Sequence, residues 1–515
     1  MAAVSFRGWA TAAVLVLMTA ASGTCWAQQP GSGTRAIQLP PIAGQQSGVS
    51  EEQSASPSMT SSVNTLNTQV RVQGSYSSSA LDPNATGGSI TLTLIEAVRR
   101  GLEFNLGKTG ADAQGRQAQA QRIAARSSLL PNIGGSLSEN AAKVDLAAEG
   151  FNASLFGGMG GFSFPTTAGP FHYYDLHGSL QQTALDFTAI HNYRSTVQTA
   201  DAAAFDARQA REEVVLAVTG SYLQLMATAA LIEEQRVEVE YAGASYKQAR
   251  AQAEAGNKAP IDANRSLVEL QTEQQRLRSQ LGDMQKQKNA LARLIGLPAG
   301  EEIVISEKLD AQPGDSAPVE ETVRRAWTQR LDLRAAEAQL RAAEEARKAA
   351  GAEYLPAATV SGMYGVQGVN PNTGNGVFQA SASLTIPIFN GGRTHADTAQ
   401  ADAVVTERRA ELSSLRGAVE LDVRNAYIDL TVANDQVNTA ESNRKLALSI
   451  LQQSQDRFSV GVADSVEVVN SQEALASADH DKVSSVFAQN LARISLAHAM
   501  GEAEKVLPDL FKGSK

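Results

Sequence analysis

The chain repeats itself, and this repetition limits its architecture more than any other feature of the 515-residue sequence. Residues 96–100 (EAVRR) recur as residues 321–325 (ETVRR), and the same shift of 225 residues carries Leu130-Pro131 onto Leu355-Pro356. Three further landmarks recur at a shift of 205 residues, namely Tyr222, Gly256 and Gly296 as Tyr427, Gly461 and Gly501. Constant shifts at separated landmarks indicate a tandem duplication. We assign residues 91–300 to the first repeat, 301–318 to a connecting segment and 319–503 to the second repeat.

Each repeat begins with the same pattern. A helical segment, at about 91–128 and 319–353, ends before a Leu-Pro pair, because proline disfavours helix in the residue that precedes it. Alternating apolar and polar residues then predict a pair of strands. The strand segments are 133–137 and 174–180 in the first repeat, and 358–366 and 378–388 in the second, with loops at 143–171 and 368–377.

A very long helix follows each strand pair. Residues 190–255 and 393–459 contain no proline and almost no glycine, and a helix of this length spans roughly 100 Å. Apolar residues of the second segment step by fours and threes, as in a coiled-coil seam: Leu415, Val419, Val423, Ala426, Leu430, Ala433, Val437 and Ala440. Gly256 and Gly461 end these helices, and return helices are predicted at about 260–295 and 464–500.

Composition agrees with a mainly helical protein. Hydrophobic residues make up 43% of the chain but aromatic residues only 5%, which is typical of closely packed Ala- and Leu-rich helices. The formal net charge is −10. Since no basic surplus exists to bind a phosphate backbone, nucleic acid is excluded as a partner.

The N-terminus has the pattern of an export signal. Arg7 precedes an apolar stretch at 10–21, and we place a signal peptide at 1–27. Cys25 is the only cysteine, and its lipidation stays open. Residues 28–90 are rich in Gln, Ser, Gly and Pro and predict a disordered linker, and 504–515 form a C-terminal tail. No further window of eighteen apolar residues is expected, which leaves a periplasmic or secreted protein, or outer-membrane insertion as strands.

Four amphipathic strands per chain cannot close a barrel, because membrane barrels begin at about eight strands. Several copies must therefore pool their strands. Helices of roughly 100 Å cannot lie within a hydrocarbon layer of about 30 Å, so they must project into the aqueous space behind it. The expected product is a continuous channel.

At this point the sequence resembles the TolC family of outer-membrane efflux proteins, over about 91–503. The resemblance rests on the duplication, on the Leu-Pro pair before the first strand of each repeat, and on two segments. These segments are 386–392 (IPIFNGG), after the last strand, and 457–468 (RFSVGVADSVEV), around the second turn.

The resemblance implies a homotrimer in the cell outer membrane, with a twelve-stranded β-barrel and a periplasmic α-barrel. It also implies docking to a periplasmic adaptor and an inner-membrane pump, and a broad class of exported small molecules or polypeptides. Membrane-junction positions are Pro131, Pro356 and Pro387. The adaptor would dock at the turns, at Gly256, Asn257, Gly461 and Val462.

The family closes its periplasmic end with acids near these turns, and counting from each turn glycine carries that role onto Asp262 and Glu467. The next ring position holds Asn470, where related sequences have another acid. Phe458 stands at the aromatic partner position without a hydroxyl, and Ala463 at the usual basic position. An alternative stays open, in which Asp262 and Glu467 are solvated acids stabilised by helix N-termini.

No motif indicates catalysis, a cofactor or a metal site, so we expect a passive duct rather than an enzyme. Two alternatives remain. A periplasmic adaptor would show one helical hairpin flanked by β-rich segments, and a coiled-coil adhesin or spacer would show uninterrupted heptads without strands.

Overall fold

A computed structural model of the chain describes residues 49–55, 66–83, 88–146, 148, 166–256, 259–311, 317–370, 372–463 and 465–509. The predicted signal peptide 1–27, with Cys25, lies outside these residues. Within the described part of the chain most residues are helical and few are in strands, which confirms the predicted fold class.

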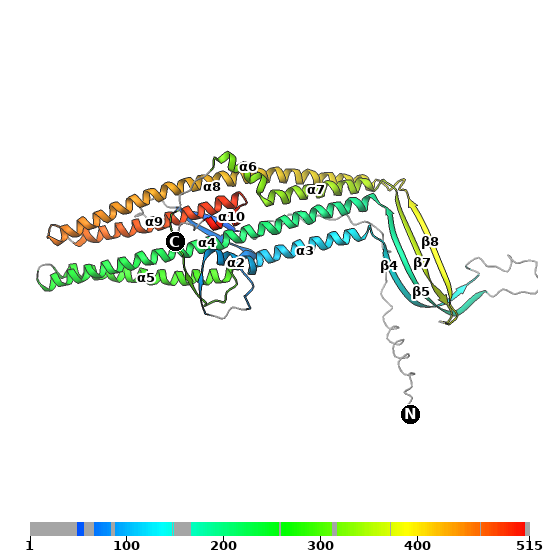
Figure 1. Ribbon diagram of the computed structural model, residues 1–515, viewed down its shortest axis with the longest axis horizontal. Helices are drawn as coiled ribbons and strands as arrows, with labels where there is room; N and C mark the ends of the chain where they lie inside the picture. Colours follow the sequence, from blue (N-terminus) through cyan, green and yellow to red (C-terminus); the bar gives the residue numbers. More distant parts are fainter. Residues whose placement is uncertain are drawn as a thin grey trace, which may run out of the picture. The chain divides into compact units, whose positions relative to one another are not determined.

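Each repeat consists of two short helices, two strands, one very long helix and a return helix (Figure 1). The first repeat contains α2 (Leu94–Phe104), α3 (Leu106–Ser127), β4 (Asn132–Asp145), β5 (Thr167–Leu185), α4 (Phe187–Glu254) and α5 (Pro260–Leu294). The second contains α6 (Val319–Gln329), α7 (Leu331–Ala352), β7 (Ala357–Gly368), β8 (Asn375–Thr385), α8 (Arg393–Ser459) and α9 (Ser465–Ala499). Helix α4 packs against α3, α5, α7 and α9, and thereby joins the two repeats.

The predicted seam of α8 is its packed face. Val419, Val423, Leu430, Ala433 and Ala440 are buried. All of them except Ala440 belong to an apolar core that α6, α7 and α9 complete. The step of fours and threes therefore marks the face along which α8 packs on its neighbours.

Helix α4 contains an apolar stretch that the sequence reasoning missed. One window of eighteen residues in α4 has a mean hydropathy of 1.7, so by length and composition it could cross a membrane. That window is 72% buried inside the protein. Apolar residues of this part of α4, such as Val218, Tyr222 and Leu225, form the largest core of the described chain with α2, α5 and α9. Its apolarity is that of a core helix.

The predicted helices that open the repeats are each interrupted at one residue, so the expectation of a single unbroken helix is wrong there. Asn105 and Arg330, 225 residues apart, have extended ψ angles of 132° and 126°. The Asn105 side chain accepts the Gly107 N–H at 2.8 Å and donates to the Tyr76 carbonyl at 2.8 Å. Arg330 instead pairs with Asp332 at 2.7 Å. These polar contacts compensate for the break in the helical ladder.

Glycines at the duplicated positions have positive φ. The values are 74° for Gly256, 78° for Gly461, 79° for Gly296 and 75° for Gly501. A Cβ on Gly296 would lie 2.7 Å from the Ala80 carbonyl oxygen, whereas a Cβ on Gly256 would meet nothing within 4 Å. Glycine is thus required by backbone conformation at both positions, and by packing as well at Gly296.

The four long strands form one antiparallel sheet in the order β4-β5-β7-β8. Strands β4 and β8 are its edges, and no other described strand pairs with either. The last strand ends at Thr385, so the predicted continuation through Ile388 is wrong, since Pro387 has no N–H to donate. Strands β4 and β5 also extend into the predicted loop 143–171.

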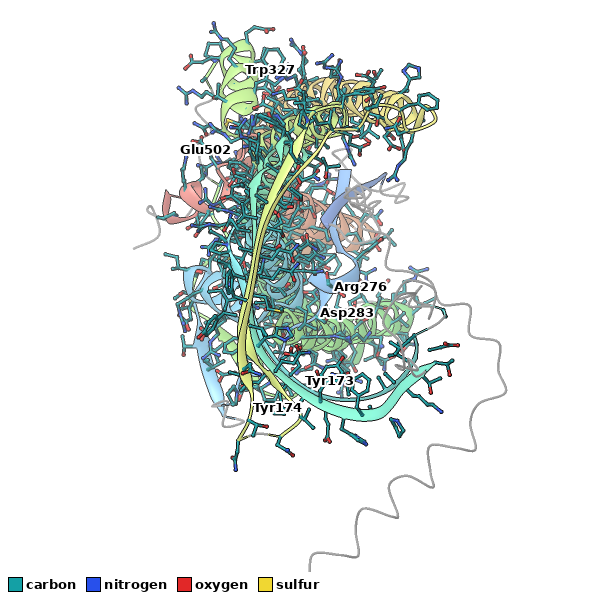
Figure 2. All side chains as sticks on the ribbon, turned by 90° about the vertical axis from the view of Figure 1, so that its right-hand side faces the viewer. Tyr173, Tyr174, Arg276, Asp283, Trp327 and Glu502 are labelled. Atoms are coloured by element: carbon teal, nitrogen blue, oxygen red, sulfur yellow. The ribbon has the colours of Figure 1, made fainter. Side chains whose placement is uncertain are left out.

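One face of this sheet is apolar and the other polar. Large apolar residues point to one side and are exposed there, namely Ile133, Leu137, Leu176, Tyr364, Phe378 and Leu384. On the other side, hydroxyl groups pair across β7 and β8, with 2.8 Å between Thr359 and Ser383 and 2.7 Å between Ser361 and Ser381. Figure 2 labels Tyr173 and Tyr174, neighbours in β5 that belong to opposite faces.

The prediction of disorder across 28–90 is wrong for its described parts. Strands β1 (Val49–Ala55) and β2 (Leu66–Val72) pair with each other, and η1 (Gly74–Ser77) follows. Ala80 donates its N–H to the Phe104 carbonyl at 2.9 Å, and Asp82 donates to the Gly296 carbonyl at 2.8 Å. The helix ends of the first repeat supply partners that the segment's own composition does not reveal.

The segments outside the repeats also contact the first repeat. In the connecting segment 301–318, β6 (Glu302–Ile305) pairs in parallel with β3 (Ser89–Leu92). Farther along, the Glu307 carboxylate accepts the Tyr222 hydroxyl at 2.7 Å. After the second repeat, Glu504 in α10 (Ala503–Val506) pairs with Arg211 at 2.7 Å. A last turn, η3 (Leu507–Asp509), ends the described chain.

The two kinds of turn glycine provide a matched test of the packing. We expect Gly256→Ala to cost about 1–2 kcal/mol, the price of a left-handed residue with a side chain. Gly296→Ala should lower the melting temperature at least twice as much, because its Cβ also collides with Ala80 and Phe104. Circular dichroism at the helical minimum, recorded during heating of the purified protein, measures both. Equal shifts would contradict the packing of the 74–83 segment on this turn.

Candidate functional site

The candidate site lies at the turns of the two long hairpins, α4–α5 and α8–α9. Both turns are at the same end of the helices, opposite the sheet (Figure 1). Gly256 and Gly461 are exposed there, and Val462 is 69% exposed. Asn257, predicted at the first turn, lies outside the described residues. In the second turn the Val462 N–H donates to the Arg457 carbonyl at 2.9 Å, which closes the end of α8.

Asp262 and Glu467 occupy equivalent positions in the first turns of α5 and α9. Each acid has a basic neighbour, but from a different place. Asp262 lies 3.9 Å from Arg265 in its own helix, whereas Glu467 lies 3.0 Å from Arg457 at the end of α8. Both acids are therefore at a helix N-terminus and at a hairpin end, as the two alternative interpretations require.

The basic partners of the two acids stand at positions that are not equivalent in the two repeats. The position equivalent to Arg265 in the second repeat is Asn470, and the position equivalent to Arg457 in the first repeat is Gln252. Asn470 is exposed on α9. Each repeat thus keeps the acid but pairs it with a base at a different position.

Phe458 packs within its own hairpin. Its ring is 8% exposed and packs with Leu451, Val468 and Leu475 in a core formed by α8 and α9 alone. Beside it, the hydroxyls of Ser454 and Ser471 lie 2.8 Å apart and are buried. The aromatic residue at this position therefore stabilises its own hairpin.

Between the two hairpin ends lies an apolar groove of about 370 Å³ that sequence reasoning missed. Helix α5 contributes Ile261 and Val268, which are 54% and 62% exposed, and α9 contributes Val466 and Val469. The spacing of seven between Ile261 and Val268 is a helical-face signal that could have been found. Exposed apolar side chains gathered in a hollow are typical of an interaction surface.

The three junction prolines stand where helix and sheet meet. Pro131 and Pro356 directly precede β4 and β7, and Pro387 follows β8 by two residues. Each lacks an N–H, so none can continue a ladder of the sheet at these positions.

On the polar face of the sheet, three side chains approach the arrangement of a hydrolase triad. Ser136 Oγ lies 3.1 Å from His177 Nε2, and His177 Nδ1 lies 2.8 Å from Asp175. Ser136 Oγ is also 3.4 Å from Nδ1, so it lies beside the ring rather than in line with Nε2. The surrounding residues are paired in the sheet ladders, which leaves no evident pair of amides for an oxyanion. We assign these residues to a polar lining.

Comparison with known proteins agrees with this geometry. The family model described as "Outer membrane efflux protein" matches residues 110–297 and 322–502. The chain is 25% identical to the pyoverdine export outer membrane protein OpmQ of Pseudomonas aeruginosa over 414 residues, which cover 76% of this chain and 81% of OpmQ. It is 22% identical to the outer membrane protein TolC of Vibrio cholerae over 351 residues, or 65% of this chain and 80% of TolC.

The fold also matches a solved structure. The outer membrane protein VceC of Vibrio cholerae superposes with a TM-score of 0.66 at 19% identity, over 79% of this chain and 96% of VceC. The two matched segments of the family model correspond to most of the two repeats, and together they cover more than half of the chain. The protein therefore belongs to the family of outer membrane efflux proteins.

Proposed function

We propose that this outer-membrane efflux channel is a trimeric, passive exit duct of a tripartite export system. Three copies pool their strands into one twelve-stranded barrel, and their helices form a tube behind it. A periplasmic adaptor docks at the hairpin turns and an inner-membrane pump supplies the energy. The observation that carries this proposal is the four-stranded sheet with two open edges and one exposed apolar face.

The open edges favour a ring of copies. An unpaired row of N–H and C=O groups is strongly unfavourable in hydrocarbon, so a sheet that enters a membrane must close. Edge β8 of one copy can pair with edge β4 of the next. With lipid outside, the apolar face bearing Ile133 and Phe378 would point outward, and the hydroxyl pairs of β7 and β8 would line a wet interior.

The helices support the same assembly. Helix α8 buries its seam, yet its opposite side carries Leu421, Ile428, Leu446 and Ile450, each more than 50% exposed. Successive members are 7, 18 and 4 residues apart, which are close to whole numbers of helical turns and place them along one stripe. Neighbouring copies packed along this stripe would remove it from water.

The polar lining suits water-soluble cargo. OpmQ is named for pyoverdine export, and we propose export of small molecules for this chain, with polypeptides as a second class. The groove at the hairpin ends, with Ile261 and Val466, supports docking of an adaptor helix tip. Two full repeats with a strand pair each disfavour an adaptor or a coiled-coil spacer.

Cysteine pairs across neighbouring copies test the trimer. The experiment uses double-cysteine variants in a Cys25→Ser background. Each variant combines one cysteine in β4, at Gly134, Ser136 or Ser138, with one in β8, at Val377, Gln379 or Ser381. At least one pair should give covalent dimers and trimers on denaturing gels after mild oxidation, because the two edges pair only between copies.

A matched internal pair provides the control for this experiment. Leu176 and Val366 face each other on the central strands β5 and β7. Cysteines there should crosslink within one chain, which then still migrates as a monomer on the gel. A ladder that extends beyond three copies, or monomers alone at every pair, would contradict the trimer.

The pore-acid assignment is tested at Glu467. We expect Glu467→Gln to weaken the block of the reconstituted channel by divalent cations about two- to fivefold, the size of an exposed charge interaction. Its cation conductance should fall as well, because one negative charge leaves the pore. Conductance in planar lipid bilayers measures both quantities. Glu103→Gln, which removes an exposed acid from α2 far from the turns, should leave them unchanged. An unchanged block and conductance in Glu467→Gln would leave this acid as a helix-stabilising residue only.

A further inference from the structure

A second group of acids lies deeper along the hairpins, between α4, α5 and α9. A cavity of about 10 Å³ is lined there by Glu238 of α4, Glu269 and Glu273 of α5, and Glu473 of α9. These four residues are called the carboxylate cluster below. A space of this size holds about one water molecule. The cluster lies where the first hairpin packs on the second, about 12 to 18 residues from the turn glycines in sequence.

Glu238 is the exceptional member of the carboxylate cluster. Its side chain is buried, with 7% exposure, and within the described part of the chain it has no hydrogen bond or ion pair. Glu273 is also buried, with 4% exposure, but it accepts from Gln235 and from Arg276, both at 2.5 Å. Burial of a charged carboxylate without a partner is strongly unfavourable.

The cations near the carboxylate cluster are already paired with other acids. Asp479 of α9 and Glu234 of α4 act on Glu238, and Arg276 of α5 acts on Glu269. The next charged groups are Arg444 of α8 and Lys482 of α9, which act on Glu234, and Glu441 of α8, which acts on Arg444. Arg276 pairs with Glu273, Arg444 with Asp479, and Lys482 with Glu441 at 3.3 Å. Negative charge around Glu238 therefore exceeds the positive charge available to it.

The cluster is not inherited from the duplication. At the shift of 205 residues, the positions equivalent to Glu238, Glu269 and Glu273 hold Asn443, Ala474 and Ala478 in the second repeat. Three acids are thus concentrated on one hairpin, at the surface that meets the other. No group of three or more His, Cys, Asp or Glu residues in the described chain is arranged to hold a metal ion. Protonation of the carboxylates would supply compensating charge.

We propose that the carboxylate cluster is a proton-operated latch between the two hairpins. When protonated, Glu238 and Glu269 donate hydrogen bonds to neighbouring carboxylates and hold α9 against α4 and α5. When the protons leave, several negative charges share the space of one water molecule, and their repulsion loosens the contact. The link to opening of the duct rests on the proposed function; the latch itself requires only that the hairpins can separate.

The pH dependence follows from the direction of the shifts. Burial, followed by the charges of Asp479 and Glu273, raises the pKa of Glu238 to about 7. Burial and the Glu273 carboxylate also raise the pKa of Glu269. A separated, solvated glutamate would titrate near 4.5. The packed state binds protons more tightly, so its advantage is complete at low pH and is lost as pH rises from 4.5 towards about 7.

Spin labels at two exposed positions measure the separation directly. We expect cysteines replacing Val237 on α4 and Ala474 on α9, in a Cys25→Ser background, to report the distance by double electron–electron resonance in the full-length, detergent-solubilised protein. Between about pH 5 and about pH 8 the ratio of separated to packed hairpins should rise by about ten- to a hundredfold, as the pKa of one carboxyl implies.

Glu238→Gln should remove most of this response and keep the hairpins packed at the higher pH, because its amide is neutral and of similar size. Glu240→Gln removes an exposed acid one half-turn away and should respond as the unsubstituted protein does. A pH response that survives Glu238→Gln, or none in the unsubstituted protein, would overturn the latch. Packing restored at about pH 8 by Ca²⁺ alone would also overturn it, in favour of a cation site. The cysteine crosslinks test the trimer independently of the spin labels. A failure of the latch can therefore be told apart from a failure of the proposed trimeric duct.

Discussion

The unpaired edges of the four-stranded sheet are the constraint on which the other features depend. A sheet whose one face is lined by Leu137, Tyr364 and Phe378 is suited to hydrocarbon, yet β4 and β8 leave their backbone groups without partners among the described strands. In water such edges are tolerable, but in a bilayer they are not. In the proposed assembly, the chain gains a stable membrane form by closing a ring with its own copies. The same closure places the polar face inside, and so creates a passage without any dedicated pore-forming segment.

The duplication supplies both strand pairs of this sheet, but the two repeats are not alike in their other parts. Both repeats keep the turn glycines, the strand pair and the acids Asp262 and Glu467. They differ in the residues that their hairpins bury. The first hairpin carries Glu238 and its neighbours, whereas the second carries the buried Phe458 and the Ser454–Ser471 pair. The first hairpin thus presents an acidic, imperfectly compensated surface to the second, whereas these residues of the second hairpin pack between its own two helices. Only the acidic surface is sensitive to charge.

The periodicity of apolar residues predicted most of the fold, because it depends on which face of each helix or strand is buried. The seam through Val419 and Val423 and the turns at Gly256 and Gly461 follow from spacing and from backbone preference. The breaks at Asn105 and Arg330 do not, because capping contacts with Tyr76 and Asp332 decide them. The packing of residues 74–83 was missed for the same reason: its partners are carbonyl groups of distant helix ends, which composition cannot show.

The candidate site illustrates the same limit at closer range. Counting from the turn glycines led to Asp262 and Glu467, since the count crosses only a short turn and the start of the following helix. The carboxylate cluster escaped, because Glu238, Glu269 and Glu473 come from three helices and up to 235 residues of sequence separate them. In the sequence of its own helix, each of these residues has the pattern of an ordinary solvated acid. Only the pairing of helix faces makes Glu238 buried and unpaired, and a buried acid without a base is costly unless it is protonated. Such a group lowers the stability of the contact it occupies, which suits a contact that must open.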